Sequence, residues 1–184
     1  PRENVQIMWC SISTCFLHGF ADRTCPTNEW HIGQLRRWAK LTDHLYVWNY
    51  YMNDENQTYQ LPLPNLRLAE PNIRFQVALG VKGMFLQSTS SCHSNEFDEL
   101  RNYLLSSLLW DPSRDGDKLM QEWLDLHYGP ASPPITRWIH RLHDRSVASG
   151  KHCRCLGGRY EDYGLDQTDI DAGLEAIEQA LELA

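Results

Sequence analysis

The chain has 184 residues and a net charge of −7, with 42% hydrophobic and 22% charged residues. These values are typical of one globular domain with a sizeable core. They disfavour nucleic-acid binding, which needs a concentrated basic face, and no apolar run approaches the ~20 residues of a membrane span. The chain starts at Pro1 and enters a predicted strand within a few residues. We therefore expect it to be a piece of a longer protein.

Three short apolar runs each precede an amphipathic helical pattern. The runs are Asn4–Ile12, Leu45–Tyr51 and Val81–Gln87. Strands that alternate with helices predict a parallel sheet, because each helix returns the chain to start the next strand in the same direction. Since the carboxyl ends of parallel strands collect functional groups, the loops after these three runs are the expected site.

Helical patterns follow each strand and then fill the rest of the chain. Helices are predicted at Ile32–Leu41, Leu66–Glu70, Asn72–Leu79, Glu96–Trp110, about 116–128, about 134–148 and Ile170–Leu183, the last with a capping box from Thr168 to Asp171. A closed (β/α)8 barrel takes about 250 residues. We therefore expect an α/β fold in which residues 1–112 are the last strand–helix units of a TIM-type barrel and residues 113–184 are a helical extension.

Cysteine and histidine residues in the first loop raise the question of a metal site. Cys15, His18, Cys25 and His31 contain ligand types that suit zinc, but their spacing matches no standard paired knuckle. We therefore expect separate thiols and no metal. A phosphate-binding or dinucleotide-binding glycine motif is also missing from the sequence, so no cofactor is predicted.

Polar and aromatic residues cluster just after the predicted strands. Asn49 and Gln87 can bond sugar hydroxyls, and Trp48 and Tyr50 can stack on the apolar face of a pyranose. Asp54 can act as a general base. Two histidines, His18 and His93, complete the set as groups that orient a carboxylate or contact ligand. Each residue also has a structural interpretation: strand-end support, core packing, loop capping or an exposed acidic turn.

Several segments together resemble a known bacterial family. They are Trp48–Tyr50 followed by Leu61–Asn65, Gly80–Phe85, Glu96–Tyr103 with Leu108–Pro112, and Tyr128–Gly129. As a set they are similar to the domain-of-unknown-function 4838 family, whose members occur in carbohydrate-active proteins with a glycosidase-type barrel. The strand–loop–helix unit that ends in Leu-Trp-Asp-Pro also resembles the closing unit of α-glucuronidases. The similarity covers about residues 2–130.

The resemblance implies a protein that binds and hydrolyses a glycan, with the remaining barrel strands and the general acid supplied upstream of this chain. Hydrolysis needs two carboxyl groups that flank the scissile bond. The family pattern places a glutamate after Gly-x-Phe, where this chain has Leu86. This departure leaves open a catalytically inactive carbohydrate-binding domain, and a purely structural domain is the further alternative.

Overall fold

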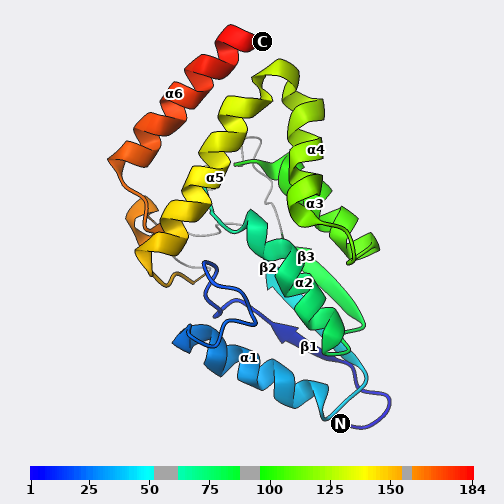
Figure 1. The fold of residues 1–184 in the computed structure, drawn as a ribbon. Helices are drawn as coiled ribbons and strands as arrows, with labels where there is room; N and C mark the ends of the chain where they lie inside the picture. Colours follow the sequence, from blue (N-terminus) through cyan, green and yellow to red (C-terminus); the bar gives the residue numbers. More distant parts are fainter. Residues whose placement is uncertain (52–61, 88–95, 155–158) are drawn as a thin grey trace.

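The computed structural model describes residues 1–51, 62–87, 96–154 and 159–184. It has a mixed α/β fold, with a small sheet at one end and a group of long helices at the other (Figure 1). The strands are β1 (Ile7–Cys10), β2 (Leu45–Tyr50) and β3 (Gly83–Gln87), in the spatial order β1-β2-β3. Both neighbouring pairs are parallel, as the alternation of strands and helices predicts.

The crossover helices α1 (Pro26–Ala39) and α2 (Ala69–Ala78) pack against one face of the sheet. The 3-10 helix η1 (Leu66–Leu68) leads into α2. Leu45 and Val47 of β2 point to this covered face and pack with Ile32 and Leu35 of α1. Because side chains alternate along a strand, the residues between them point to the opposite face.

The opposite face of the sheet carries large side chains that no described helix covers completely. Met8 is 57% exposed and Phe85 is 51% exposed, although both lie within strands. Gly83 lies beside Tyr46 on this face, and a Cβ at residue 83 would come within 3.0 Å of the Tyr46 ring. The glycine therefore lets the tyrosine ring come close to the backbone of β3.

The helix α3 (Asp98–Trp110) follows β3. The described part of residues 113–184 is mainly helical, as predicted, and its elements are α4 (Gly116–Tyr128), η2 (Gly129–Ala131), α5 (Ser132–Ser149), η3 (Tyr160–Tyr163) and α6 (Gln167–Leu183). Leu100, Leu104 and Leu108 of α3 are buried with leucines of α4 and with Ile73 of α2. This apolar core joins the helices to the sheet region.

Two local predictions are wrong at helix starts. The first helix begins at Pro26 rather than near Ile32, because Cys25 serves as its N-cap and proline suits the first turn. The last helix begins at Gln167, since the Asp166 side chain accepts from the backbone N–H of Thr168 and Asp169 reaches back to Asp166. The capping box is therefore Asp166–Asp169, not Thr168–Asp171.

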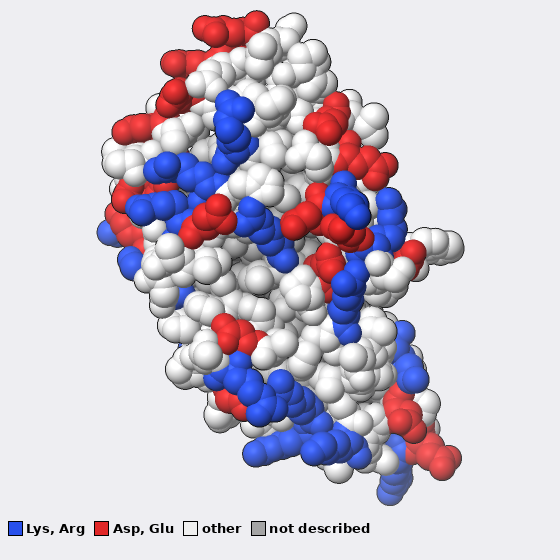
Figure 2. Space-filling model, in the orientation of Figure 1, with Lys and Arg blue, Asp and Glu red and all other residues white. Residues whose placement is uncertain are grey.

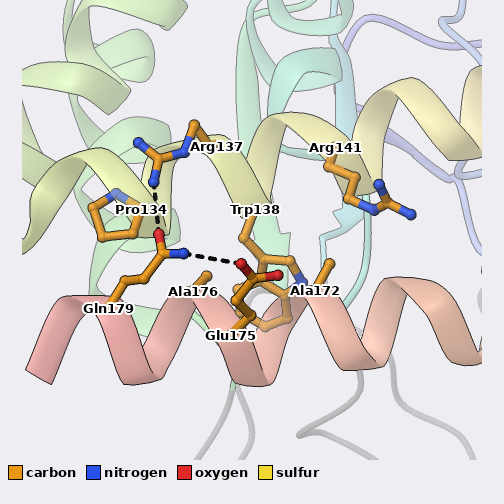
Figure 3. A pocket seen from close by; sticks show the side chains of 8 residues that line it. All are labelled: Pro134, Arg137, Trp138, Arg141, Ala172, Glu175, Ala176 and Gln179. Atoms are coloured by element: carbon orange, nitrogen blue, oxygen red, sulfur yellow. Dashed lines mark hydrogen bonds between the residues drawn. The ribbon is translucent and has the colours of Figure 1, made fainter.

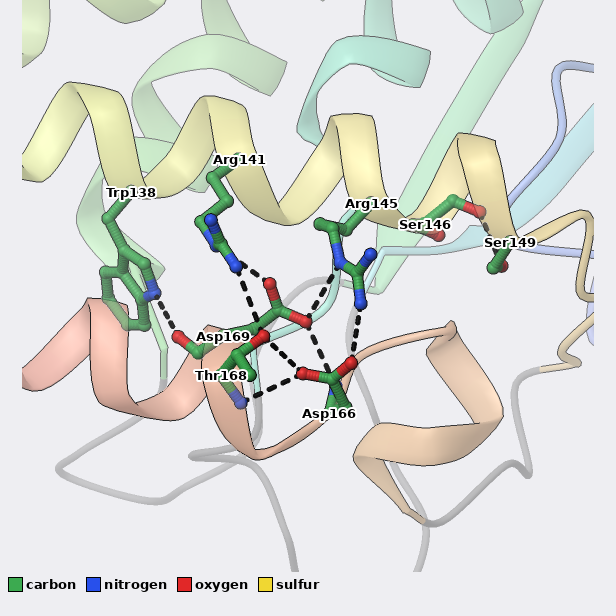
Figure 4. A network of polar contacts seen from close by, with 8 residues as sticks. All are labelled: Trp138, Arg141, Arg145, Ser146, Ser149, Asp166, Thr168 and Asp169. Carbon is green, nitrogen blue, oxygen red and sulfur yellow. Dashed lines mark hydrogen bonds and ion pairs between the residues drawn. The ribbon is translucent and has the colours of Figure 1, made fainter.

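The start of α6 is tied to α5 by a polar network centred on Asp169 (Figure 4). This carboxylate is 1% exposed and accepts from Arg141 Nε at 2.8 Å and from Arg145 Nε at 3.3 Å. Trp138 Nε1 donates to the Asp169 carbonyl at 3.2 Å, and the Trp138 ring packs where Gly173 has no Cβ. These contacts fix how α6 lies along α5.

A shallow groove of about 190 Å³ runs between α5 and α6 (Figure 3). Its polar side chains bond one another: Arg137 donates to Gln179, which in turn donates to Glu175. The groove is therefore a packing seam with paired polar groups rather than a built ligand site.

Charges of both signs share the surface seen in Figure 2. Acidic residues gather along α6, and basic residues including Arg36 and Arg37 lie over α1. Of the helices in the described residues, none is long and apolar enough to span a bilayer.

Candidate functional site

The carboxyl ends of the three strands meet at one edge of the sheet. In register, Cys10 lies beside Trp48, and Tyr50 lies beside Gln87. The ladder continues past β1, because Ser11 N–H donates to the Trp48 carbonyl. The loops that the sequence singled out therefore leave the sheet from a common rim.

An aromatic group lies at this rim on the uncovered face. The Trp48 ring is stacked with Tyr50 at 6.0 Å and 12°, and it meets Phe85 edge-on at 5.0 Å and 90°. Trp48 Nε1 donates to Gln87 Oε1 at 2.9 Å, which fixes the indole plane. The structure thus brings together Trp48, Tyr50 and Gln87, three residues predicted to bind substrate.

Asn49 points away from this group. It is 1% exposed and lies on the covered face, where its amide exchanges two hydrogen bonds with Gln76 of α2 at 2.8 and 3.0 Å. Successive strand residues point to opposite faces, so Asn49 cannot share a surface with Trp48 and Tyr50. Its predicted role in sugar binding is replaced by a buried tie between β2 and α2. Leu86 also points to the covered face, where it packs against the main core.

A small cavity lies beside the rim, between described residues. It has a volume of about 10 Å³ and is lined by residues of the first loop, the end of β2 and α2, among them Thr14, Tyr51, Asn65 and Asn72. This volume suits one water at most. A sugar ring does not fit in this cavity.

Two candidate residues, Asp54 and His93, lie outside the described residues.

The carboxylate of Glu96 follows the third loop and is described. It is paired with Arg101 at 2.7 Å, and Arg101 also donates to Asn65 at 2.5 Å. Burial raises the pKa of Glu96 to about 7. Arg101 is only 3% exposed, because α3 turns its side chain toward Glu96 and Asn65.

His18 lies in a cluster with two cysteines and a distant histidine. Its Nδ1 is 3.2 Å from Cys15 Sγ, and Cys25 Sγ is 3.2 Å from His152 Nδ1. The two imidazole rings stack at 4.4 Å and 19°. Potential ligand atoms of all four residues lie within 4.8 Å of one another, so this group could hold a metal ion.

Electrostatics in this cluster follow from burial. Cys15 is 1% exposed, and burial raises the pKa of its thiol to about 11. Desolvation and the neighbouring His152 both lower the pKa of His18. Near neutral pH the thiol of Cys15 and the ring of His18 are therefore held in their neutral forms.

The first loop is shaped so that these side chains converge. Asn28 of α1 accepts from Cys15 N–H at 2.8 Å and donates to the carbonyls of Cys15 and His18. Cys25 is held at the helix start, where its Sγ accepts from Asn28 N–H at 3.5 Å. One buried asparagine thus braces the loop and contacts two of the cysteines.

The fourth member reaches the cluster through a short backbone pairing. Cys15 forms an antiparallel bridge with Arg154, and Phe16 N–H donates to the Cys153 carbonyl at 2.8 Å. The group of possible zinc ligands found from the sequence contained His31 instead of His152. His31 lies within α1 against Trp30, outside the cluster. The only sequence signal for His152 was a histidine next to cysteine in the segment after α5.

A comparison with protein-family models supports the family assignment. The family described as Domain of unknown function (DUF4838) matches residues 1–140. No curated protein and no solved structure matches the chain. The match covers β1 to β3, the aromatic group and three of the four cluster residues. Because the family match spans well over half of the sequence, the chain belongs to the DUF4838 family.

Proposed function

We propose that this chain is the C-terminal part of a glycoside-hydrolase-like (β/α)8 barrel and that its strand rim binds a glycan. The single observation that carries the proposal is the uncovered aromatic face of a parallel sheet. Parallel sheets are normally covered on both faces. Here α1 and α2 cover one face, while Met8 and Phe85 stay more than half exposed on the other.

The side chains on the uncovered face fall into rows, as they do inside a barrel. The first row is Met8, Tyr46 and Gly83, the second is Cys10, Trp48 and Phe85, and the third is Tyr50 with Gln87. Barrel interiors are filled by stacked layers of this kind, with ligands bound above the layer at the strand carboxyl ends. In this arrangement the first row meets the remaining barrel strands, and the last rows meet ligand.

The chemistry of the upper rows suits a sugar. Flat aromatic rings pack on the C–H face of a pyranose, while polar groups at their edges bond hydroxyls. The Trp48–Tyr50 stack supplies the rings, and Gln87 holds the indole in place. Rings held by a neighbouring side chain lose little freedom when ligand binds, which favours affinity.

The proposed role of this part is binding rather than catalysis. A glycosidase needs two carboxyl groups beside the scissile bond. Among the described residues, the first carboxylate after the third strand is that of Glu96, and it is paired with Arg101. In a hydrolase, the general acid would come from upstream strands, with Asp54 as the candidate base in this chain.

The test compares two tryptophans in the full-length protein. Trp48→Ala removes the platform, while Trp30→Ala removes a 64% exposed indole of α1 that is not part of the aromatic group. We expect affinity electrophoresis on a panel of polysaccharides to show retardation that Trp48→Ala abolishes and Trp30→Ala keeps. Equal retardation of both variants, or none for the unmodified protein, would refute the proposal. Aryl-glycoside turnover then separates a hydrolase from an inactive binding domain.

A further inference from the structure

We propose that Cys15, His18, Cys25 and His152 bind one zinc ion that fastens the loop after β1 to the segment after α5. This inference does not depend on glycan binding. It starts from the convergence of two thiols and two imidazoles, whose donor atoms lie within 4.8 Å of one another. Cys15, His18 and Cys25 lie within eleven consecutive positions of the chain. The fourth ligand, His152, comes from the segment after α5.

The distances suit a tetrahedral zinc centre. With zinc–sulfur bonds of about 2.3 Å and zinc–nitrogen bonds of about 2.0 Å, donors on neighbouring corners lie roughly 3.3–3.8 Å apart. The two sulfur–nitrogen contacts are each 3.2 Å, between Cys15 and His18 and between Cys25 and His152. The other donor pairs lie within 4.8 Å, so shifts of about an ångström or less would complete the coordination.

The donor set selects the metal. Two sulfurs and two imidazole nitrogens suit zinc, whereas calcium and magnesium prefer oxygen ligands. The cluster contains no carboxylate among its members. Four protein ligands fill a tetrahedral shell and leave no open position for water or substrate, which is the pattern of a structural site.

Hydrogen bonds within the protein hold the ligand residues in place. Asn28 braces the loop that carries Cys15 and His18, and Cys25 is held at the N-terminus of α1. The helix N-terminus also favours the negative charge of a zinc-bound thiolate. The bridge between Cys15 and Arg154 then delivers His152. Such support of the ligands by surrounding hydrogen bonds is a usual feature of metal sites.

A bound zinc ion would link two segments that are far apart in the sequence. Cys25 and His152 are 127 positions apart. The apolar cluster beneath contains Cys15, Leu142 and Tyr163 and receives Tyr50 from the end of β2. Closing so long a loop restricts the unfolded chain strongly. The ion would therefore hold the helical region against the strand rim.

The test measures zinc in the full-length protein, purified without chelator, by mass spectrometry of the metal. We expect Cys25→Ser and His152→Ala each to lose one equivalent of zinc relative to the unmodified protein. The matched controls are Cys10→Ser, an exposed cysteine outside the cluster, and His31→Ala, the histidine that sequence spacing suggested. Both controls should keep the full zinc content. Loss in the controls alone, or no loss in the cluster variants, would overturn the assignment.

A second measurement uses the unmodified protein, so that it does not depend on whether the variants fold. Cobalt exchanged into the unmodified protein should give the intense visible bands of tetrahedral cobalt and a thiolate charge-transfer band. Chelation should make two buried thiols reactive toward N-ethylmaleimide and lower the melting temperature, and added zinc should reverse both. Octahedral cobalt spectra, thiols that react equally before and after chelation, or an intact mass showing a Cys15–Cys25 disulfide would each refute the zinc site.

Discussion

The two faces of the small sheet differ in what surrounds them rather than in their apolar character. On one face Val47 is 0% exposed beneath α1 and α2, and Asn49 and Gln76 form a closed pair. On the other face Trp48 and Phe85 meet edge-on, and Phe85 stays half exposed. Both faces of the strands are apolar, so the strand pattern alone does not indicate which face the helices of this chain cover.

The largest expected effect comes from placing a charge on each face in turn. Val47→Asp buries a carboxylate without a partner, so we expect a loss of more than about 4 kcal/mol in the free energy of unfolding. Phe85→Asp, as the control, should change it by less than about 1 kcal/mol because the side chain reaches water. Urea titration followed by circular dichroism measures both. Equal losses would mean that the two faces are equally covered.

His143 of α5 is buried, and its protonation reports whether water reaches the interior of the helical region. Burial lowers the pKa of His143 to about 4, and Arg67 and Arg101 nearby add to this effect. Its Nδ1 donates to the Ile139 carbonyl at 2.8 Å, and Nε2 accepts from Arg67 N–H at 3.4 Å. The neutral ring therefore fills a site that a charged ring would disrupt.

The pH dependence follows from that lowered pKa. In the unfolded chain the ring takes a proton below about pH 6.5, while the folded protein resists protonation until about pH 4. The stability from the neutral ring is thus complete above pH 6.5 and is lost as pH falls, by about 3 kcal/mol. His143→Gln should flatten the stability profile relative to the unmodified protein. Parallel profiles would show that the ring is solvated.

A smaller effect is expected for the Asn49–Gln76 pair. Asn49→Ala leaves the Gln76 amide buried without its partner, which should cost about 2 kcal/mol. The double variant Asn49→Leu, Gln76→Leu should recover most of that loss, because no polar group stays unsatisfied. Thermal unfolding measures this cycle. Failure of the double variant to recover stability would contradict this explanation, and loss of glycan affinity with the fold intact would restore Asn49 as a ligand residue.

The smallest change concerns the uncovered face in the isolated chain of 184 residues. An exposed apolar sheet face favours association, so sedimentation should show concentration-dependent oligomers. The double variant Met8→Ser, Phe85→Ser should shift the chain toward monomer with less than about 1 kcal/mol change in stability. A sharp monomeric melt of the unmodified chain at every concentration would count against the truncated-barrel proposal.

Much of the local structure could be predicted from the sequence. The three strand runs contain β1, β2 and β3, and the helix predicted near 116–128 coincides with α4. Asp115 and Gly129 mark the ends of that helix by local capping chemistry, which acts within a few residues. The start of α1 was harder to predict, because cysteine is an unusual N-cap.

The candidate site was only partly predictable. Residues one apart on β2 separated onto opposite faces, so Trp48 and Tyr50 stayed together while Asn49 turned toward Gln76. His18 belongs to a cluster completed by His152 rather than His31. No pattern within the first loop could identify that partner, because it comes from beyond α5.

The parallel order of strands and helices and the family could be predicted from the sequence, because periodicity, capping and motif similarity are properties of neighbouring residues. Which strand face is covered, and which histidine meets Cys25, could not be predicted in this way. Those outcomes depend on packing between α1, α2 and α5 and on a backbone bridge between Cys15 and Arg154. Contacts between residues far apart in the chain are set by how whole elements pack, and spacing along the chain does not record them.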